Sequence, residues 1–277
     1  MIAAFGTHFQ NPIMLAAGTA GFGRELDSTV ALDRLGGILT KSVSPEPQHG
    51  HPAPRVAEFA GGMVNAIGLA NPGVTVVAER ELPWLASHLH RARVVVSVVG
   101  DTVEGYGEVV GRLSGFDVVT AFELNLSCPN TARGGEHFGA NDEVLRDVVR
   151  RCARETTRPL IAKLAPTLPD VGRTATVAVE AGAAGIAVVN TLPGAGRVAA
   201  GQGGVSGPPL LPIGLLAVRR VRAAVPVPII GVGGVRSLDD VEAYRLEGAT
   251  LVAIGTAALA DPRLPERLAA RWERRHG

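Results

Sequence analysis

The sequence predicts an α/β fold, a (β/α)₈ or TIM barrel, because short β-branched runs alternate with longer amphipathic stretches along the whole chain. Eight such pairs in 277 residues match the usual size of this barrel, in which a helix follows each strand. A doubly wound parallel sheet is the alternative. Residues 1–277 contain no linker and no internal repeat, so we expect a single domain.

Each expected strand is a short apolar run bounded by turn residues. The strands are expected at residues 12–17, 37–42, 93–99, 120–127, 159–164, 185–190, 227–231 and 250–255. Helical periodicity is found at residues 25–35, 73–90, 103–113, 142–155, 170–181, 210–224, 238–247 and 264–275. Asn141, Thr167 and Ser237 supply start signals for three of these helices.

Two loops are longer than the usual connection in a barrel. Residues 44–69 are rich in Pro and Gly, and we expect them to fold back as a hairpin over the carboxyl ends of the strands. Residues 128–140, with the sequence CPNTARGGEHFGA, follow the fourth strand and are expected to form a flap over the same face. Loops of this length bind or gate a ligand.

The composition excludes several classes of protein. Lys and Arg total 27 and Asp and Glu total 26, so the net charge of +1 argues against nucleic acid or an anionic membrane as partner. Cys128 and Cys152 are too few for a disulfide framework, a four-thiolate zinc site or an iron–sulfur cluster. No run reaches the roughly 18 apolar residues of a membrane span. We therefore expect a cytoplasmic protein without a metal site that acts on a small molecule.

The two lysines of the chain fall at expected strand ends. Arg supplies the other cationic residues, whereas Lys41 ends the second strand and Lys163 ends the fifth. Asn125 and Asn190 end the fourth and sixth strands. Because barrel enzymes build their active sites at the carboxyl ends of the strands, we interpret these positions as functional.

Glycine-rich turns follow the last two strands. Gly233 and Gly234 come after the seventh strand, and Gly255 precedes Thr256 after the eighth. Glycines in these loops let backbone N–H groups approach a phosphate, although ordinary tight turns would give the same pattern. No GxGxxG opens a βαβ unit and no P-loop is present, so neither a Rossmann domain nor a nucleotide triphosphatase is supported.

The two cysteines have different surroundings. Cys128 lies on the polar loop after the fourth strand, beside Asn130, where nearby ammonium groups favour the thiolate. That setting suits it to proton abstraction or nucleophilic attack. Cys152 lies within a helical pattern and is interpreted as a small buried hydrophobic residue.

Nine segments together resemble the class 1 dihydroorotate dehydrogenases, from about residue 11 to about residue 262. NAIGL and NLSCPN are the specific ones, and with PWL they are most similar to the catalytic subunit of class 1B. The segments are NPIMLAAGTAGFG, LTKSVSPEP, PRVAEFAGGMVNAIGLANPG, ELNLSCPNTARGGEHFG, IAKLAP, VVNTLPG, GGVSGP, IIGVGGV and AIGTA.

The resemblance implies FMN-dependent oxidation of (S)-dihydroorotate to orotate in pyrimidine (UMP) synthesis. Cys128 matches the family's catalytic base, and Lys163 matches the lysine that stabilises the reduced flavin. The residues that match cofactor contacts are Ala17, Lys41, Ser42, Ser97, Asn125, Lys163, Val189, Gly207, Gly233, Gly234, Gly255 and Thr256. The residues that match substrate contacts are Lys41, Asn65, Ala66, Ile67, Gly68, Leu69, Asn125, Asn130, Asn190 and Thr191.

The chain also departs from the family pattern. Ala17 and Ser97 stand where the family usually has Ser and Asn near the flavin, the loop at residues 192–203 is shorter than usual, and the chain ends soon after one helix. Two alternatives therefore stay open, namely action on another dihydropyrimidine and a non-catalytic FMN-binding paralogue. A tRNA-acting flavin barrel is disfavoured by the near-zero net charge.

Class 1B enzymes work with an electron-transfer subunit that carries FAD and a 2Fe–2S cluster. The resemblance therefore implies such a partner, and with it a homodimer or a heterotetramer.

Overall fold

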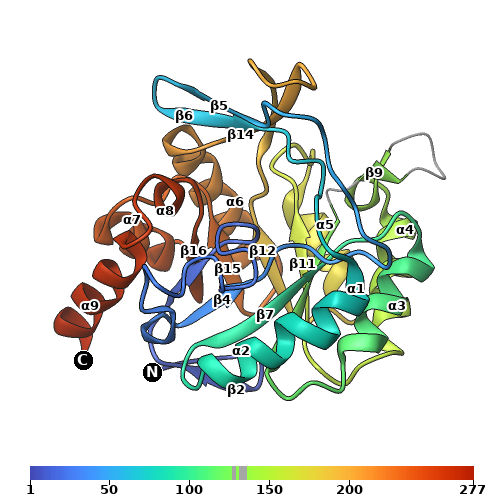
Figure 1. The fold of residues 1–277 in the computed structure, drawn as a ribbon, viewed down its shortest axis with the longest axis horizontal. Helices are drawn as coiled ribbons and strands as arrows, with labels where there is room; N and C mark the ends of the chain where they lie inside the picture. Colours follow the sequence, from blue (N-terminus) through green and yellow to red (C-terminus); the bar gives the residue numbers. More distant parts are fainter. Residues whose placement is uncertain (127–128, 131–135) are drawn as a thin grey trace.

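The computed structural model describes residues 1–126, 129–130 and 136–277, and its centre is a closed barrel of parallel strands (Figure 1). Each strand pairs with its neighbours in chain order, and the last pairs with the first. The expected strands are confirmed, with ends shifted by a few residues. They are β3 (Ile13–Leu15), β4 (Gly37–Leu39), β7 (Arg93–Val98), β8 (Val119–Asn125), β11 (Leu160–Leu164), β12 (Gly185–Val188), β15 (Ile229–Val232) and β16 (Leu251–Ile254).

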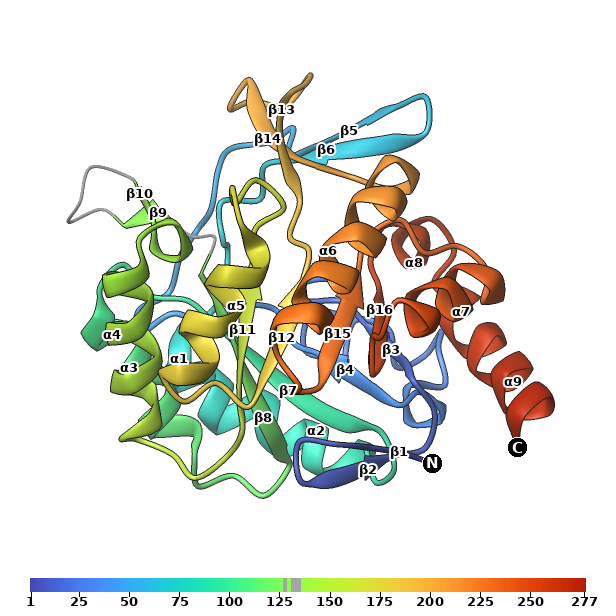
Figure 2. The same ribbon diagram turned by 180° about the vertical axis from the view of Figure 1, so that it is seen from behind.

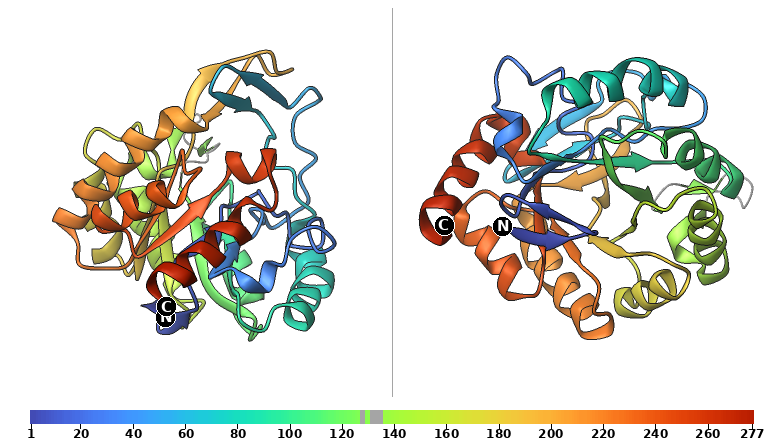
Figure 3. Two further views of the ribbon diagram at one scale, coloured as in Figure 1. Left: turned by 90° about the vertical axis from the view of Figure 1, so that its left-hand side faces the viewer. Right: turned by 90° about the horizontal axis from the view of Figure 1, so that it is seen from below.

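Helices surround the barrel, as the view along its axis in Figure 3 shows. Asn141 and Ser237 cap their helices as expected, and Ser237 forms a capping box with Asp240. Thr167 does not cap a helix; Asp170 does, by accepting from the backbone N–H of Arg173. The helices are α1 (Gly73–Val76), the π-helical η2 (Val77–Glu81), α2 (Leu82–His88), α3 (Val103–Leu113), α4 (Asp142–Ala153), α5 (Val171–Glu180), α6 (Leu211–Ala224), α7 (Leu238–Leu246), α8 (Thr256–Ala260) and α9 (Leu264–His276).

The expected helix over residues 25–35 is wrong. The chain runs there through successive turns and forms only the short 3₁₀ helix η1 (Leu32–Arg34). The Glu25 carboxylate accepts from the backbone N–H of Phe22, three residues earlier, and so holds the chain in a turn. Ser28 and Thr29 then follow, and neither favours a helix interior.

A hairpin that the sequence did not predict closes the amino-terminal end of the barrel. β1 (Ile2–Ala4) pairs antiparallel with β2 (Thr7–Phe9), and Figure 3 shows this hairpin across the lower opening. Phe5 and Phe9 are buried in the barrel interior, with ring centroids 6.3 Å apart. A side chain at Gly185 would meet the Phe5 ring at 2.4 Å, so this strand needs glycine there. The barrel is therefore sealed from below by apolar rings.

A four-stranded antiparallel sheet stands over the opposite end (Figure 2). The loop at residues 44–69 supplies β5 (Val56–Phe59) and β6 (Gly62–Asn65), which confirms the expected hairpin. The sequence did not predict a second hairpin, β13 (Leu192–Ala195) with β14 (Gln202–Ser206). β14 pairs with β6 and joins the two hairpins into one sheet.

The segment expected to form a flap is described in part. The backbone of β9 (Pro129–Asn130) pairs antiparallel with β10 (Glu136–His137), and the short helix η4 (Phe138–Ala140) follows. The Gly139 N–H donates to the Leu126 carbonyl at 2.8 Å, which ties the end of this segment back to the strand it left.

In the part of the chain that the structure describes, no helix is both long and apolar enough to cross a membrane.

Asp33 links η1 to the turn that precedes β7. Its Oδ1 accepts from the backbone N–H groups of His90, Arg91 and Ala92 at 2.9, 2.7 and 2.9 Å. Burial acts to raise the pKa of this carboxyl, but the three N–H groups, with the nearby charge of His90, outweigh burial and hold the pKa below its usual value.

We predict that Asp33→Asn lowers the unfolding free energy at neutral pH and that its deficit relative to wild type shrinks in acid. A carboxyl with a lowered folded-state pKa stabilises the fold fully above its unfolded pKa of about 3.9, and this stability is lost as pH falls through the folded value. Urea unfolding between neutral pH and pH of about 3 measures the deficit. Asp27→Asn, at an exposed carboxyl, is the control, and a deficit for Asp33→Asn that does not change with pH contradicts the prediction.

Candidate active site

Side chains that point into the barrel change from apolar to polar toward the carboxyl ends of the strands. Two residues beyond the apolar Val95, Ala121 and Ile161, the inward positions carry a hydroxyl, a carboxylate and an ammonium group. These groups belong to Ser97, Glu123 and Lys163. Because residues i and i+2 face the same side of a strand, the polar groups collect at the carboxyl-terminal mouth.

Glu123 and Lys163 form a buried ion pair at this mouth. Lys163 Nζ lies 3.5 Å from Glu123 Oε1, and the side chains are 9% and 0% exposed. Ser97 Oγ donates to the same Oε1 at 3.2 Å, and it lies 2.9 Å from Ser42 Oγ. The second carboxylate oxygen, Glu123 Oε2, is buried and finds no hydrogen-bond partner among the described residues. The ammonium group of Lys163 is therefore fixed from below by a carboxylate.

Sequence reasoning missed Glu123. The signal lies in the alternation along TAFELN, in which Ala121, Glu123 and Asn125 share one side of the strand and Phe122 and Leu124 share the other. An acidic residue at an inward position of an otherwise apolar strand needs a buried partner. The matching cation is Lys163 on the adjacent strand β11.

Two asparagines join neighbouring parts of the mouth. Asn190 Nδ2 donates to Asn125 Oδ1 at 3.2 Å, and Asn190 Oδ1 accepts from the backbone N–H of Thr191 at 2.8 Å. The hydroxyl of Tyr106, from α3, donates to the Asn125 carbonyl at 2.7 Å. The structure thus brings these two predicted asparagines together, with both amides partly exposed at the mouth.

The predicted substrate loop lies beside the upper sheet. Asn65 Nδ2 donates to the Gly204 carbonyl at 3.1 Å, and a side chain at Gly204 would meet Thr191 Oγ1 at 2.1 Å. Asn65 and Thr191 therefore both contact Gly204. Residues 66–69 continue from β6, and His51 binds two of their carbonyls, those of Ala66 and Ile67. Gly68 and Leu69 both have positive φ, which turns the chain back toward the barrel.

The glycine turns after β15 and β16 both pack against the segment that leads into α6. Gly233 and Gly234 have φ values of +123° and +76°, and the hydroxyl of Tyr244 holds the Gly233 carbonyl at 2.8 Å. Gly207 packs within 2.9 Å of Gly62 and 3.7 Å of Thr256, measured from where its Cβ would stand. Within the described chain, the backbone N–H groups of Gly234 and Gly255 donate no hydrogen bond. Two donors without a partner in adjoining turns would form a cradle for an anion, and we call these turns the glycine cradle.

The remaining predicted residues are placed as follows. Lys41 is half-buried, and its backbone N–H donates to the Gly21 carbonyl. Ala17 packs at the edge of the interior apolar cluster, and Val189 is buried and donates to the Val232 carbonyl. Cys128 lies outside the described residues, and of Asn130 only the backbone is described.

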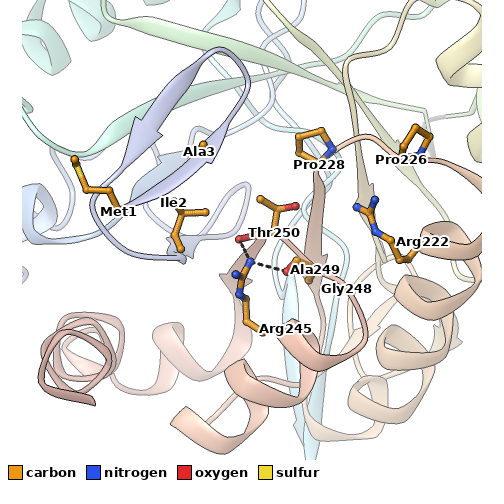
Figure 4. A pocket seen from close by; sticks show the side chains of 10 residues that line it. All are labelled: Met1, Ile2, Ala3, Arg222, Pro226, Pro228, Arg245, Gly248, Ala249 and Thr250. Atoms are coloured by element: carbon orange, nitrogen blue, oxygen red, sulfur yellow. Dashed lines mark hydrogen bonds between the residues drawn. The ribbon is translucent and has the colours of Figure 1, made fainter. Parts of the chain in front are cut away.

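A cavity of about 560 Å³ lies at the other end of the barrel, beside the amino-terminal hairpin (Figure 4). Arg245 donates there to the Ala249 and Thr250 carbonyls at 2.8 and 2.6 Å, as Figure 4 shows, and Arg222 donates to the Val225 and Val227 carbonyls. These guanidinium groups hold the turns that precede β15 and β16. Among the described residues, no group of three His, Cys, Asp or Glu side chains is arranged to hold a metal ion.

Fold and mouth together define a class of protein, a (β/α)₈ barrel with polar side chains and glycine turns at the carboxyl ends of its strands, where barrels of this class bind their ligands. The family model described as dihydroorotate dehydrogenase matches residues 2–274. The chain therefore belongs to the dihydroorotate dehydrogenase family of oxidoreductases, whose members use a flavin.

Relatives with curated names agree with this assignment. The chain is 39% identical over 280 residues to the dihydroorotate dehydrogenase B (NAD(+)) catalytic subunit of Citrifermentans bemidjiense, covering 98% of this chain and 91% of the relative. It is 42% identical over 265 residues to the protein of the same name from Geobacillus kaustophilus, covering 93% and 84%. The protein of that name from Listeria monocytogenes is 40% identical over 278 residues, covering 98% and 91%.

The residues at the mouth fit a flavin with a phosphate tail. The glycine cradle offers free N–H donors for the phosphate, and the fixed ammonium of Lys163 offers a cation for a ring that gains negative charge. A side chain at Gly255 would meet Ala16 Cβ at 3.6 Å and Thr19 Oγ1 at 3.8 Å, which are ordinary contacts, so the described residues leave room for a methyl group at this position.

We predict that Gly255→Ala leaves the thermal unfolding of the flavin-free chain unchanged and weakens flavin binding about tenfold, since the added methyl group faces the mouth and a tenfold change corresponds to about 1.4 kcal/mol. Flavin fluorescence titration measures the binding. Gly234→Ala is the contrasting variant, because its Cβ would lie 2.5 Å from Leu211 N and must destabilise the fold as well. Unchanged flavin affinity in Gly255→Ala contradicts this placement of the cradle.

Proposed function

We propose that this protein catalyses the FMN-dependent oxidation of (S)-dihydroorotate to orotate in pyrimidine synthesis. The observation that carries the proposal is the buried Lys163–Glu123 pair beside the linked amides of Asn125 and Asn190, at the mouth of a barrel of this family. A planar, acidic ring with amide edges needs donors and acceptors together, and asparagine supplies both.

The reaction removes two hydrogens and forms the C5=C6 double bond. Cys128, as thiolate, takes the C5 proton, and the hydrogen at C6 leaves with its electron pair as hydride. FMN held at the mouth would supply the acceptor for that hydride. Lys163 supplies a fixed positive charge that stabilises the negative charge gained by the cofactor on reduction. Each step therefore has a group to receive the proton or the electron pair.

The other residues of the mouth bind and orient. Asn65 and Thr191, which meet at Gly204, with Asn125 and Asn190, offer amide and hydroxyl groups to the edges of the substrate ring. Lys41 supplies a second cation for the anionic substrate. The glycine turns at Gly207, 233–234 and 255–256 hold the phosphate of FMN, and Ser42 and Ala17 line the flavin site.

A second subunit completes the electron path. The relatives above carry the name of a catalytic subunit and of an NAD(+)-linked enzyme. This chain has two cysteines and cannot hold a four-thiolate cluster, so an FAD and 2Fe–2S subunit would take electrons from the flavin in a heterotetramer. A homodimer that passes electrons directly to another acceptor is the alternative. The cytoplasm is the expected compartment, since the chain lacks the cysteines of a disulfide framework.

Anaerobic titration of the FMN-loaded chain with dihydroorotate is expected to bleach the flavin absorbance, because the hydride passes to the flavin and no oxidant removes it. Absorbance spectra recorded during the titration make the measurement. An unchanged spectrum contradicts the proposed function, and bleaching by dihydrouracil in preference to dihydroorotate would assign the site to another dihydropyrimidine. FMN that binds to the chain but is bleached by neither compound would support a non-catalytic FMN-binding paralogue.

Cys128→Ala is expected to bind FMN as wild type does and to slow flavin reduction by about a hundredfold or more, since a positioned base contributes at least that factor. Stopped-flow reduction by dihydroorotate makes the measurement. Cys152→Ala is the matched control. Cys152 is buried in α4, where burial raises the pKa of its thiol to about 12, and its removal should leave the reduction rate near that of wild type. A wild-type rate in Cys128→Ala removes that residue from the mechanism.

A further inference from the structure

Glu123 is an acidic side chain that the proposed reaction does not use. It is fully buried in the barrel, and one of its two carboxylate oxygens has no partner among the described residues. Burying a carboxylate is unfavourable unless it is paired, and its cationic partner is Lys163. An apolar residue of similar size would fill the same space without this cost, so the carboxylate calls for a reason beyond packing.

The two lysines of the mouth differ in how they are held. Lys163 lies against Glu123, whereas Lys41 has no carboxylate within ion-pair distance in the described part of the chain. Around Lys163, the adjacent strands present Glu123 and Asn125 from β8 and Ala187 and Val188 from β12. The carboxylate of Glu123 is thus the one charge that these two strands present to the Lys163 ammonium.

Hydroxyl groups extend the contact away from Lys163. Ser97 donates to the same oxygen of Glu123 that faces the ammonium, and Ser42 lies within hydrogen-bond distance of Ser97. Ser97 is itself 0% exposed, and its backbone N–H donates to Thr40 Oγ1. The chain of contacts therefore crosses from the end of β4 through β7 and β8 to β11, which are neighbouring strands of the barrel.

We propose that Glu123 is a positioning residue that acts through Lys163. With Ser97 to orient it, the carboxylate holds the Lys163 ammonium in one place at the mouth, so that the cation is preorganised before the cofactor binds. Lys41, without such a partner, stays free to move onto an anionic ligand. This inference rests on the proposed FMN site, and it assigns to Glu123 no contact with substrate or cofactor.

The test is a double-mutant cycle on the dissociation constant for FMN, measured by flavin fluorescence with the full-length chain freed of flavin. Glu123→Gln keeps the shape and the hydrogen bond from Ser97 but removes the charge, and it is expected to weaken FMN binding about tenfold. Lys163→Met should weaken binding at least as much. Combined with Lys163→Met, Glu123→Gln should add no further loss, because it acts only through that lysine.

Lys41→Met provides the matched control cycle. The fold-losses of FMN affinity caused by Lys41→Met and by Glu123→Gln should multiply in the double variant, because Lys41 does not contact Glu123. Thermal unfolding of every flavin-free variant checks the fold. If Glu123→Gln does not fold, Ser97→Ala takes its place in the cycle with Lys163→Met. Ser97→Ala alone is then expected to weaken FMN binding severalfold, and it should weaken it no further when Lys163→Met is already present.

Wild-type affinity in Glu123→Gln overturns the inference, and so do losses that multiply in the Glu123→Gln, Lys163→Met double variant. A wild-type chain that binds no FMN overturns both this inference and the proposed function. A wild-type flavin that dihydroorotate does not bleach overturns the function alone, because the cycle is read from flavin affinity and not from reduction.

Discussion

A charge inside a closed barrel needs a partner, and this requirement governs where the chain places its polar groups. Phe5 and Phe9 seal the amino-terminal end, and the inward side chains above them remain apolar until the last few residues of the strands. Among the inward side chains that the structure describes, a carboxylate and an ammonium group appear there, and they appear together. Because the base of the interior is closed, the Lys163–Glu123 pair lies toward the carboxyl-terminal mouth, which is where we place the candidate active site.

The strands were predictable because strands buried on both faces read as short, nearly continuous apolar runs. The antiparallel hairpins were harder. β13 and β14 are made from LPGA and QGGVS, which lack the β-branched alternation of a self-sufficient strand, and they pair because β6 offers an edge above the barrel. The failed helix at residues 25–35 has a local and a distant cause, since Glu25 holds a turn at Phe22 and Asp33 binds the turn before β7, and together they override the apolar spacing.

Much of the candidate site was visible in the residue types alone. Arg supplies nearly all the positive charge of this chain, so the two lysines at strand ends were informative, and the glycine turns were found by position. Glu123 was missed because single acidic residues are normally exposed to solvent. Two features together show that it is buried: it shares the inward side of its strand with Ala121, and a cation, Lys163, lies on the adjacent strand. Side-chain pairing across strands is a property of barrel register, which residue types do not specify.

The same pairing changes the meaning of one departure from the family pattern. A serine in place of an amide beside the flavin first suggests a lost hydrogen bond and a weakened site. In the barrel, however, Ser97 is fully buried. Its hydroxyl donates to Glu123 and lies against Ser42, so it orients the carboxylate that contacts Lys163. A shorter side chain there fits a carboxylate that must reach Lys163 from the adjacent strand. Loss of polar contact at Ser97 is therefore no argument that the site has lost its chemistry.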